Sequence, residues 1–551
     1  MKTKVILFTI CNLIICNLAI AQNITNTLGT SGVFTLKDNA TTYLSLSQST
    51  GNLSLNRSLV LPYTTGPTLG VIYKGADRFL HTYHTTESIG YNTFLGINAG
   101  NFSLLELARY NTGIGPNSLS GLTTGYHNTA IGPGALQINS TGYENTAVGV
   151  TALRSNISGF QNVAIGEQSL WLNSSGKNNT ALGFYSMNSN SIGNYNTSVG
   201  SHSLFSNSNG MENTAIGFGT LHDNTSGYDN TAVGSQSSYS NTTGYENTSV
   251  GVSSLNYNST GNSNSALGYY SLFYNITGFN NTAVGHYSLY NNNNNYNNAF
   301  GMSSLFRNVS GSNNSAFGNL SMYNNLIGFQ NTAIGNNSLL NNNGNYNTAL
   351  GYNAGSTITT GYNLTCLGID AAPSSPTAVD QVTLGNIFVT SLRCNVQTIT
   401  SLSDARDKKN ISELSLGLDF ITKLYPRQFN WDKREWYDDN ISDGSKMKDA
   451  PTAGFIAQEL DSAQTTAGAE WLNLVLKDNP EKWEATYGNL LPVMVKAIQE
   501  LKAENDELKS SNEKLAAEVE SLNIFGQKLA KLEQIVNELS SAKNTSLSQI
   551  K

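Results

Sequence analysis

The sequence predicts a mainly β protein: a repetitive β-roll or β-solenoid fibre, followed by a small α/β domain and a C-terminal coiled coil. Three observations support this fold class. A short unit recurs throughout residues 92–385, the density of charged residues rises sharply after that segment, and apolar residues near the C-terminus recur at heptad spacing.

The N-terminus has the features of an export signal. Two lysines precede an apolar run over residues 5–15, and Ala21 ends the small-x-small pattern that a signal peptidase recognises. We therefore expect residues 1–21 to be a signal peptide that is cleaved between Ala21 and Gln22. The mature protein is then secreted or held at the cell surface. No later run is apolar and long enough for a membrane span, so none is expected in the mature chain.

Residues 22–91 are expected to form an N-terminal β segment, and residues 92–385 repeat one unit. A glycine closes each unit, and the ten consecutive intervals from Gly115 to Gly285 are each 17 residues long. Seventeen residues are too few for two packed helices, and the abundant Gly and Asn disfavour helix. The repeat therefore predicts two short strands and two tight turns per unit, which form one rung of a β-solenoid.

Equivalent residues of successive rungs fall into columns. One column holds mainly leucine, from Leu136 to Leu289, and another holds asparagine, from Asn139 to Asn292. In the Thr-Ala-Ile/Val-Gly strand, Thr and Ala point to opposite faces. We expect Leu and Ile/Val to build a thin core and the asparagines to form hydrogen-bonded ladders. Because one such roll buries little apolar surface, an oligomer is expected.

The composition of the array argues against several functions. Only 13 of its 294 residues are charged, which disfavours the paired carboxylates of a glycan-cleaving enzyme. The six histidines precede Gly301 without metal-ligand spacing, so we expect them at the surface, with no metal and no cofactor. The net charge of −7, without a basic patch that carries interleaved aromatics, disfavours nucleic acid as a partner. Whether Cys366 and Cys394 pair is left open.

The composition changes after Gly385. Residues 386–401 are expected to be a connector, and 44 of the 149 residues from 403 to 551 are charged. Ser403 and Lys408 place a hydroxyl and an amine five residues apart. No histidine follows His286, so a nucleophilic Ser403 would need a lysine or a carboxylate as its base. Taken alone, this spacing is more typical of a solvated turn of Asp, Arg and Lys than of a catalytic pair.

Three motifs in this region resemble the intramolecular chaperone auto-processing domain of phage endosialidases and tail spikes. They are Ser403, Asp404, Arg406, Lys408 and Ile411; then residues 454–459 (GFIAQE); then residues 487–492 (YGNLLP), which lead into a helix. Their order favours the resemblance over the solvated turn and delimits a domain over residues 402–508. Asp407 stands where that family more often has an apolar residue, and it would stabilise protonated Lys408.

The resemblance implies an activity. In that family the domain trimerises, guides folding of the fibre before it, and cuts the peptide bond that precedes the motif serine. Here that bond is Leu402–Ser403, with Ser403 as nucleophile and Lys408 as general base. The resemblance implies supporting roles for four further residues, Asp404, Arg406, Gln458 and Glu459.

The flanking regions fit the same assembly. The repeat strands resemble head repeats of trimeric autotransporter adhesins and repeats of tail-fibre-domain surface proteins. Residues 496–540 show heptad spacing, interrupted by a slip of three residues near Gly526, which predicts a coiled coil. Asn505 and Asn512 fall at core positions of the heptads. Asparagine at such positions is better known from dimeric coiled coils than from trimers, whereas the resemblance implies a homotrimer.

Four interpretations follow. We favour a secreted trimeric fibre, an adhesin or tail-fibre-like protein whose C-terminal domain is an assembly chaperone that cleaves itself off before Ser403. Its partner would be a surface receptor or a glycan. The alternative is a purely structural surface fibre with a non-cleaving trimerisation domain. The scarcity of acids disfavours a glycan-degrading spike, and the signal peptide disfavours a membrane-tethered transcription factor.

Overall fold

The computed structural model describes residues 33–37, 42–47, 50, 52–56, 58–85, 90–393, 395 and 403–548. The predicted signal peptide with its junction between Ala21 and Gln22, the residue Leu402 and the residue Cys394 lie outside this part of the chain. Cys366 is buried in the repeat array. The chain divides into two compact units, Met1–Asp229 and Asn230–Lys551, and the repeat occurs in both.

Short antiparallel strands precede the array. They are β1 (Val33–Lys37), β2 (Thr42–Ser47), β3 (Leu53–Leu55), β4 (Ile72–Lys74) and β5 (Asp77–His81). The first three form one sheet, and β4 and β5 form a hairpin. Strand β5 pairs antiparallel with β6 (Thr93–Leu95), the first strand of the array. The hairpin therefore covers the edge of β6 that no earlier rung could pair.

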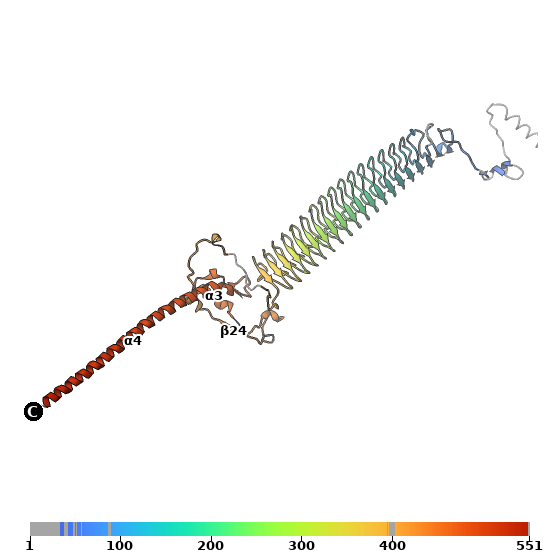
Figure 1. Cartoon of the computed structure of the whole chain (residues 1–551). Coiled ribbons are helices and arrows are strands. Elements are labelled where there is room, and N and C mark those ends of the chain that lie inside the picture. The colour runs from blue at the N-terminus through green and yellow to red at the C-terminus, as the bar shows by residue number, and fades with distance from the viewer. Residues whose placement is uncertain are drawn as a thin grey trace, which may run out of the picture. The chain divides into compact units, whose positions relative to one another are not determined.

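The array is a stack of rungs, and each rung contributes one strand to a parallel sheet (Figure 1). In the first unit the strands after β6 are β7 (Thr112–Ile114), β8 (Thr129–Ile131), β9 (Thr146–Val148), β10 (Val163–Ile165), β11 (Thr180–Leu182), β12 (Thr197–Val199) and β13 (Thr214–Ile216). Within this unit, neighbouring strands pair in register, so Ala147 lies opposite Ala130 and Ala164.

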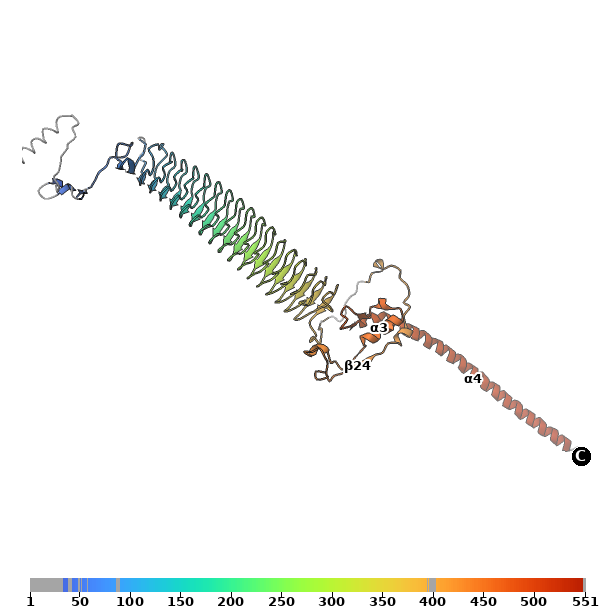
Figure 2. The same ribbon diagram turned by 180° about the vertical axis from the view of Figure 1, so that it is seen from behind.

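The second unit continues the same pattern. Its strands are β14 (Thr231–Val233), β15 (Thr248–Val250), β16 (Ser265–Leu267), β17 (Thr282–Val284), β18 (Asn298–Phe300), β19 (Ser315–Phe317), β20 (Thr332–Ile334), β21 (Thr348–Leu350), β22 (Thr365–Leu367) and β23 (Val382–Leu384). Seen from behind, the strands again follow one another along one face of the coil (Figure 2). The β-solenoid expected from the repeat is thus confirmed over residues 93–384.

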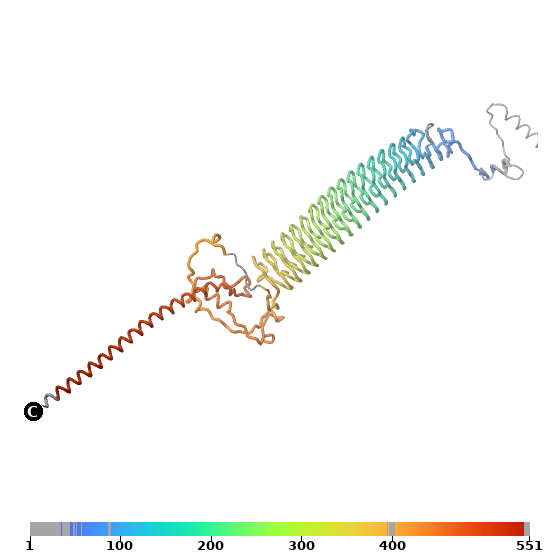
Figure 3. Tube along the Cα trace, in the orientation of Figure 1, coloured from blue at the N-terminus to red at the C-terminus, as the bar shows by residue number. Residues whose placement is uncertain are grey.

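Each rung has one strand, not the two expected from the sequence. The remainder of the rung turns through residues with positive φ, such as Thr151, Leu153 and Gln161. The tube trace shows how these turns bring the chain back to the same face (Figure 3). The glycine after each strand allows adjacent rungs to approach closely. At Gly183, φ is +138°, and an added Cβ would lie 2.6 Å from the carbonyl oxygen of Gly200.

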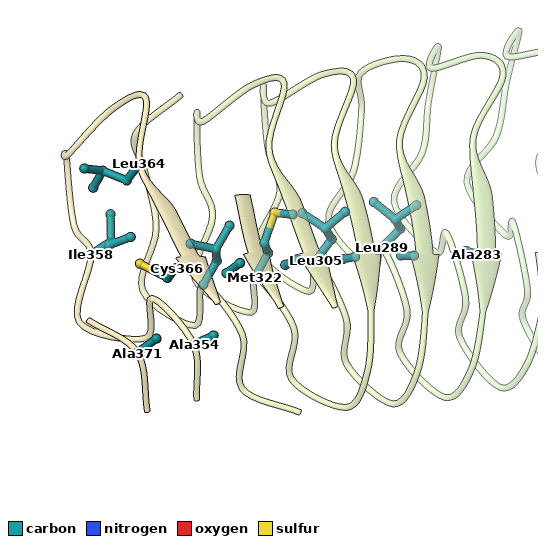
Figure 4. Close-up of a cluster of buried hydrophobic side chains, with 14 of the residues drawn as sticks. Ala283, Leu289, Leu305, Met322, Ala354, Ile358, Leu364, Cys366 and Ala371 are labelled. Atoms are coloured by element: carbon teal, nitrogen blue, oxygen red, sulfur yellow. The ribbon is translucent and has the colours of Figure 1, made fainter. Parts of the chain in front are cut away.

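The core of the solenoid is made by alanine and leucine. The central strand residue points inward, as at Ala283, and the leucine column, as at Leu289, packs against it (Figure 4). Both residues are fully buried. The expectation that Ile/Val would join this core is wrong, because the third strand residue points outward with Thr by the two-residue period. Ile131, for example, is 39% exposed.

Two buried asparagine ladders run along the rungs, as expected. In the first, Asn179 Nδ2 donates to Asn162 Oδ1 at 3.2 Å and to the Gly193 carbonyl at 2.8 Å. In the second, Asn173 Nδ2 donates to Asn156 Oδ1 at 2.7 Å. These side chains satisfy turn carbonyls that would otherwise be buried without a donor.

One histidine departs from the sequence-based expectation. His81 at the end of β5 is only 2% exposed, so its expected surface position is wrong. Its ring lies 4.9 Å from the rings of both Phe94 and Phe102. Burial lowers the pKa of His81 to about 4, and the nearby Arg78 acts in the same direction.

The region after the solenoid is a small α/β fold. Its elements are η1 (Ala405–Asp407), α2 (Leu418–Ile421), β24 (Arg427–Phe429), η2 (Arg434–Trp436), β25 (Thr452–Gly454), α3 (Ala457–Thr466), η3 (Glu470–Leu472), β26 (Val475–Leu476), β27 (Glu484–Ala485) and η4 (Tyr487–Leu490). Strand β24 pairs antiparallel with β25, and β26 with β27. Its apolar core includes Phe420, Leu460, Leu474 and Val493.

Helix α4 (Leu491–Ser548) ends the described chain and is 58 residues long. Its first turns pack on α2, where the Glu500 carboxylate accepts the Leu418 backbone N–H at 2.7 Å. Its heptad positions, such as Leu508 and Leu515, are exposed in the single chain. Among the described helices, none has the length and apolar character that crossing a membrane requires. Whether α4 forms the expected coiled coil stays a prediction.

Candidate self-cleavage site

The segment that carries the first motif lies on the surface. All residues from Ser403 to Asn410 are exposed. The short η1 turn brings the two ends of the motif together, and Lys408 Nζ donates a hydrogen bond to Ser403 Oγ. The five-residue spacing therefore places the amine and the hydroxyl in direct contact.

Asp404 and Arg406 shape this turn. Asp404 caps η1 by accepting the Arg406 backbone N–H at 2.8 Å. The same carboxylate accepts Arg406 Nη2 at 2.6 Å, and the guanidinium holds the pKa of the Asp404 carboxyl below its usual value. These contacts occupy both side chains within the turn. They hold the backbone of the turn between Ser403 and Lys408.

Residues of the later motifs contact one another and not the serine. Arg427 at the start of β24 makes a bidentate ion pair with Glu459, with nitrogen–oxygen distances of 2.6 and 3.0 Å. This pair lowers the pKa of Glu459. The Tyr487 hydroxyl lies 3.2 Å from the Phe455 backbone N and 3.3 Å from its carbonyl oxygen. The second and third motifs are thus joined in one fold.

Gln458 lies apart from the serine. It lines a cleft of about 890 Å³, together with aromatic residues that include Trp431 and Trp483. Within the described part of the chain, no hydrogen bond or ion pair joins Gln458 or Glu459 to Ser403 or Lys408.

The sequence reasoning did not single out the side chains around this cleft. Lys433 Nζ lies 5.0 Å from the centre of the Trp431 ring, and Lys482 pairs with Glu435 at 2.6 Å. The density of tryptophan and lysine between residues 431 and 448 is a signal that could have indicated such a surface. Glu500 was also missed, and its cap on α2 ties the start of α4 to this domain.

The site contains no arrangement for a metal among the residues that the structure describes, since no group of three His, Cys, Asp or Glu side chains converges there. The chemistry available is that of a hydroxyl held by an amine. Such a pair supports nucleophilic attack when the amine is neutral and can take the hydroxyl proton.

The fold and this site define a fibre-like β-solenoid protein with a small C-terminal α/β domain that holds a serine–lysine contact. Residues 403–469 match the family model of Peptidase S74, the chaperone of endosialidase, so the chain carries a domain of that family in its C-terminal region. The match implies an autoproteolytic serine peptidase in this segment, and domains of the family act in trimeric fibres. No curated protein matches the chain in the sequence comparison.

Proposed function

We propose that this protein is a secreted or cell-surface trimeric fibre whose C-terminal domain assembles it and then cleaves itself off before Ser403. The observation that carries the proposal is the contact of Lys408 Nζ with Ser403 Oγ at the first residue of the family match. The export signal expected over residues 1–21 supports the location, and the sparsely charged solenoid supports a binding role toward a surface receptor or glycan.

The proposed cleavage proceeds in two steps. Ser403 Oγ attacks the carbonyl carbon of Leu402 while Lys408 Nζ takes the hydroxyl proton. The bond between that carbon and the Ser403 nitrogen breaks, and the nitrogen leaves as an amine after it receives the proton. Water then hydrolyses the ester between Leu402 and Ser403 Oγ. The products are a new carboxylate at Leu402 and a C-terminal fragment that begins at Ser403.

Assembly is proposed to control this reaction. Water stabilises the charged form of an exposed lysine, and only neutral lysine can act as the base. Lys408 is exposed in the single chain. We propose that packing of three chains withdraws it from water and so activates the site.

The test is mass spectrometry of the purified full-length protein. Wild type is expected to yield a fragment that begins at Ser403. Ser403→Ala and Lys408→Arg are expected to yield only the intact, folded chain, since the first lacks the nucleophile and the second a base that can be neutral. Lys409→Arg is the matched control and should cleave as wild type does. An intact wild-type chain would instead support the purely structural fibre.

A further inference from the structure

Aromatic side chains form a continuous ladder along part of the solenoid surface. Four successive rungs carry an aromatic residue two positions before the ladder asparagine: Phe273, Tyr290, Phe306 and Tyr323. Their ring centres are 5.2, 5.1 and 5.1 Å apart, and the planes differ by only 3°, 4° and 7°. Each inner ring therefore has both faces covered by its neighbours.

The ladder stops at one rung. Asn256 stands where the following rungs carry Phe273 and Tyr290, and its Nδ2 is held by the Gln236 carbonyl at 2.8 Å. On the same rung, Ser253 stands where the next rung has Tyr270. Asn256 is 8% exposed and Ser253 is 3% exposed. Two short, buried side chains thus replace two large rings.

A cavity of about 370 Å³ fills the space that these short side chains leave. Phe273 and Tyr270 of the following rung line one side, and Tyr239 of the preceding rung lines the other. The middle rung contributes Ser253, Asn256 and Tyr257, and the centre of the Tyr257 ring lies 5.1 Å from that of Phe273. We call this cavity the slot.

A second rung shows how the chain closes such a gap. Asn188 also interrupts the aromatic position, and its Nδ2 donates to the Gln168 carbonyl at 3.1 Å, as Asn256 does to Gln236. There, however, the position of Ser253 is taken by Tyr185. The Tyr185 ring lies 6.1 Å from that of Phe205, at 28° to it, and fills the gap. The slot exists because Ser253 is small.

The size of the slot selects its occupant. The rungs of Tyr239 and Phe273 are two strand spacings apart, about 10 Å. Carbon contacts of 3.5–4 Å on each side would place a flat ring between walls about 7–8 Å apart. The extra width suits a puckered, saturated ring with hydrogens on both faces. Ser253 and Asn256 add a hydroxyl and a side-chain amide oxygen to the lining, and these groups suit the hydroxyls of a sugar ring.

We propose that the slot binds one pyranose ring of a glycan, with its apolar face on Phe273 and its hydroxyls toward Ser253 and Asn256. An apolar wall with a few polar groups is the usual form of a small-molecule site. The inference rests on the proposed function of the solenoid as the binding part of the fibre, and it is independent of cleavage.

The test uses the full-length protein and two sets of probes. An array of immobilised oligosaccharides identifies the preferred residue, and saturation-transfer NMR with the matching methyl glycoside distinguishes a free sugar from a residue within a chain. Ser253→Tyr and Asn256→Phe are expected to weaken binding at least tenfold. The native rungs with Tyr185 or Phe273 at these positions show that the fold accommodates both rings.

Asn188→Phe is the matched control, because Tyr185 already fills that gap, and it should bind as wild type does. Absence of any glycan binding, retention of binding by Ser253→Tyr, or binding of an aromatic peptide in place of sugar would each overturn the proposal. Cleavage and oligomeric state are measured on the same samples. A cleaved trimer that binds no glycan refutes the slot alone, whereas an intact monomer that binds glycan refutes the assembly mechanism alone.

Discussion

At the residue scale, His81 shows how strongly one enclosed side chain is constrained. Its Nε2 lies 2.8 Å from the Ala99 carbonyl, which can only accept, so Nε2 carries the proton. Its Nδ1 accepts the Tyr83 backbone N–H at 3.3 Å. A second proton on Nδ1 would abolish that acceptor and place a charge between two phenylalanine rings. The ring is therefore neutral at pH 7.

The first rungs should consequently lose stability in acid. The folded-state pKa of about 4 lies below the usual 6.5, so the unfolded chain binds the proton first. The contribution of His81 is complete above pH 6.5, declines as the pH falls toward 4, and amounts to about 3 kcal/mol. Hydrogen exchange at the Ala99 amide should report it, and His81→Gln should reduce the pH dependence. The exposed His127→Gln is the control, and an equal pH dependence in His81→Gln would contradict this assignment.

The sequence predicted the pairing of Ser403 with Lys408 but did not predict the burial of His81. Ser403 and Lys408 are five residues apart in one turn, so local geometry is enough to bring them together. His81 is buried by Phe94 and Phe102, which belong to later segments of the chain, and its spacing from them has no recognisable period. The contact of Glu459 with Arg427 was not predicted for the same reason, since the two residues are 32 positions apart in the sequence.

At the scale of the structural element, the asparagine ladder joins each rung to the next. Asn179 donates to Asn162 and to Gly193, while its own Oδ1 accepts the Asn196 backbone N–H at 3.0 Å and the Asn196 Nδ2 at 3.1 Å. The side chain uses donor and acceptor at once and is fully buried. Only an amide of this length satisfies all of these groups.

Replacing one ladder amide by a carboxylate should weaken the solenoid locally. In Asn179→Asp the lost donor would leave a buried charge facing the oxygens of Asn162 and Gly193, at a cost of about 3–5 kcal/mol. Hydrogen exchange in the adjacent rungs should accelerate at pH 7 and recover in acid, where the carboxyl is neutral. Asn178→Asp is the matched control, since that side chain is only half-buried and Asp tolerates its positive φ. Equal exchange in both variants would show that the ladder is not stabilising.

The existence and length of the rungs could be predicted because the same period recurs many times in the sequence. The direction of the strand side chains and the conformation of the turns within each rung were harder to predict. The two-residue alternation of Thr-Ala-Val decides that Val follows Thr outward, but the apolar character of Val suggested a core position. The turns hold left-handed residues as varied as Thr151, Leu153 and Gln161. No local turn signal marks such positions, and the stacking of neighbouring rungs overrides the intrinsic preference of each residue.

At the scale of the whole molecule, the solenoid and α4 differ in how much apolar surface they leave for a partner chain to cover. The solenoid buries its own leucine and alanine columns, so the argument that its thin core alone requires several chains is not supported. Helix α4 leaves Leu508 63% exposed and Leu515 59% exposed. The apolar seam of α4 is therefore the stronger reason to expect an oligomer.

Removal of that seam should prevent assembly and, with it, processing. A chain truncated before Lys496 retains Ser403 and Lys408 but loses the heptads. We expect light scattering to give three chains per particle for the Ser403→Ala protein and one for the truncated protein. The truncated protein should also remain uncleaved. Because truncation removes the Glu500 cap on α2, Leu508→Glu with Leu515→Glu in the full chain serves as a second variant. Cleavage of these monomers at the wild-type rate would refute control by assembly.

The in-register pairing of the rungs has a consequence for how such a gene can change. Each strand pairs only with the strands of adjacent rungs, as β10 does with β9 and β11. Excision of one 17-residue period, for example from Gly149 to Ile165, would join two surfaces that already match. Unequal recombination can therefore lengthen or shorten the reach of the protein in single steps while both ends keep their neighbours. Reach is then a heritable quantity that selection can adjust independently of the C-terminal domain.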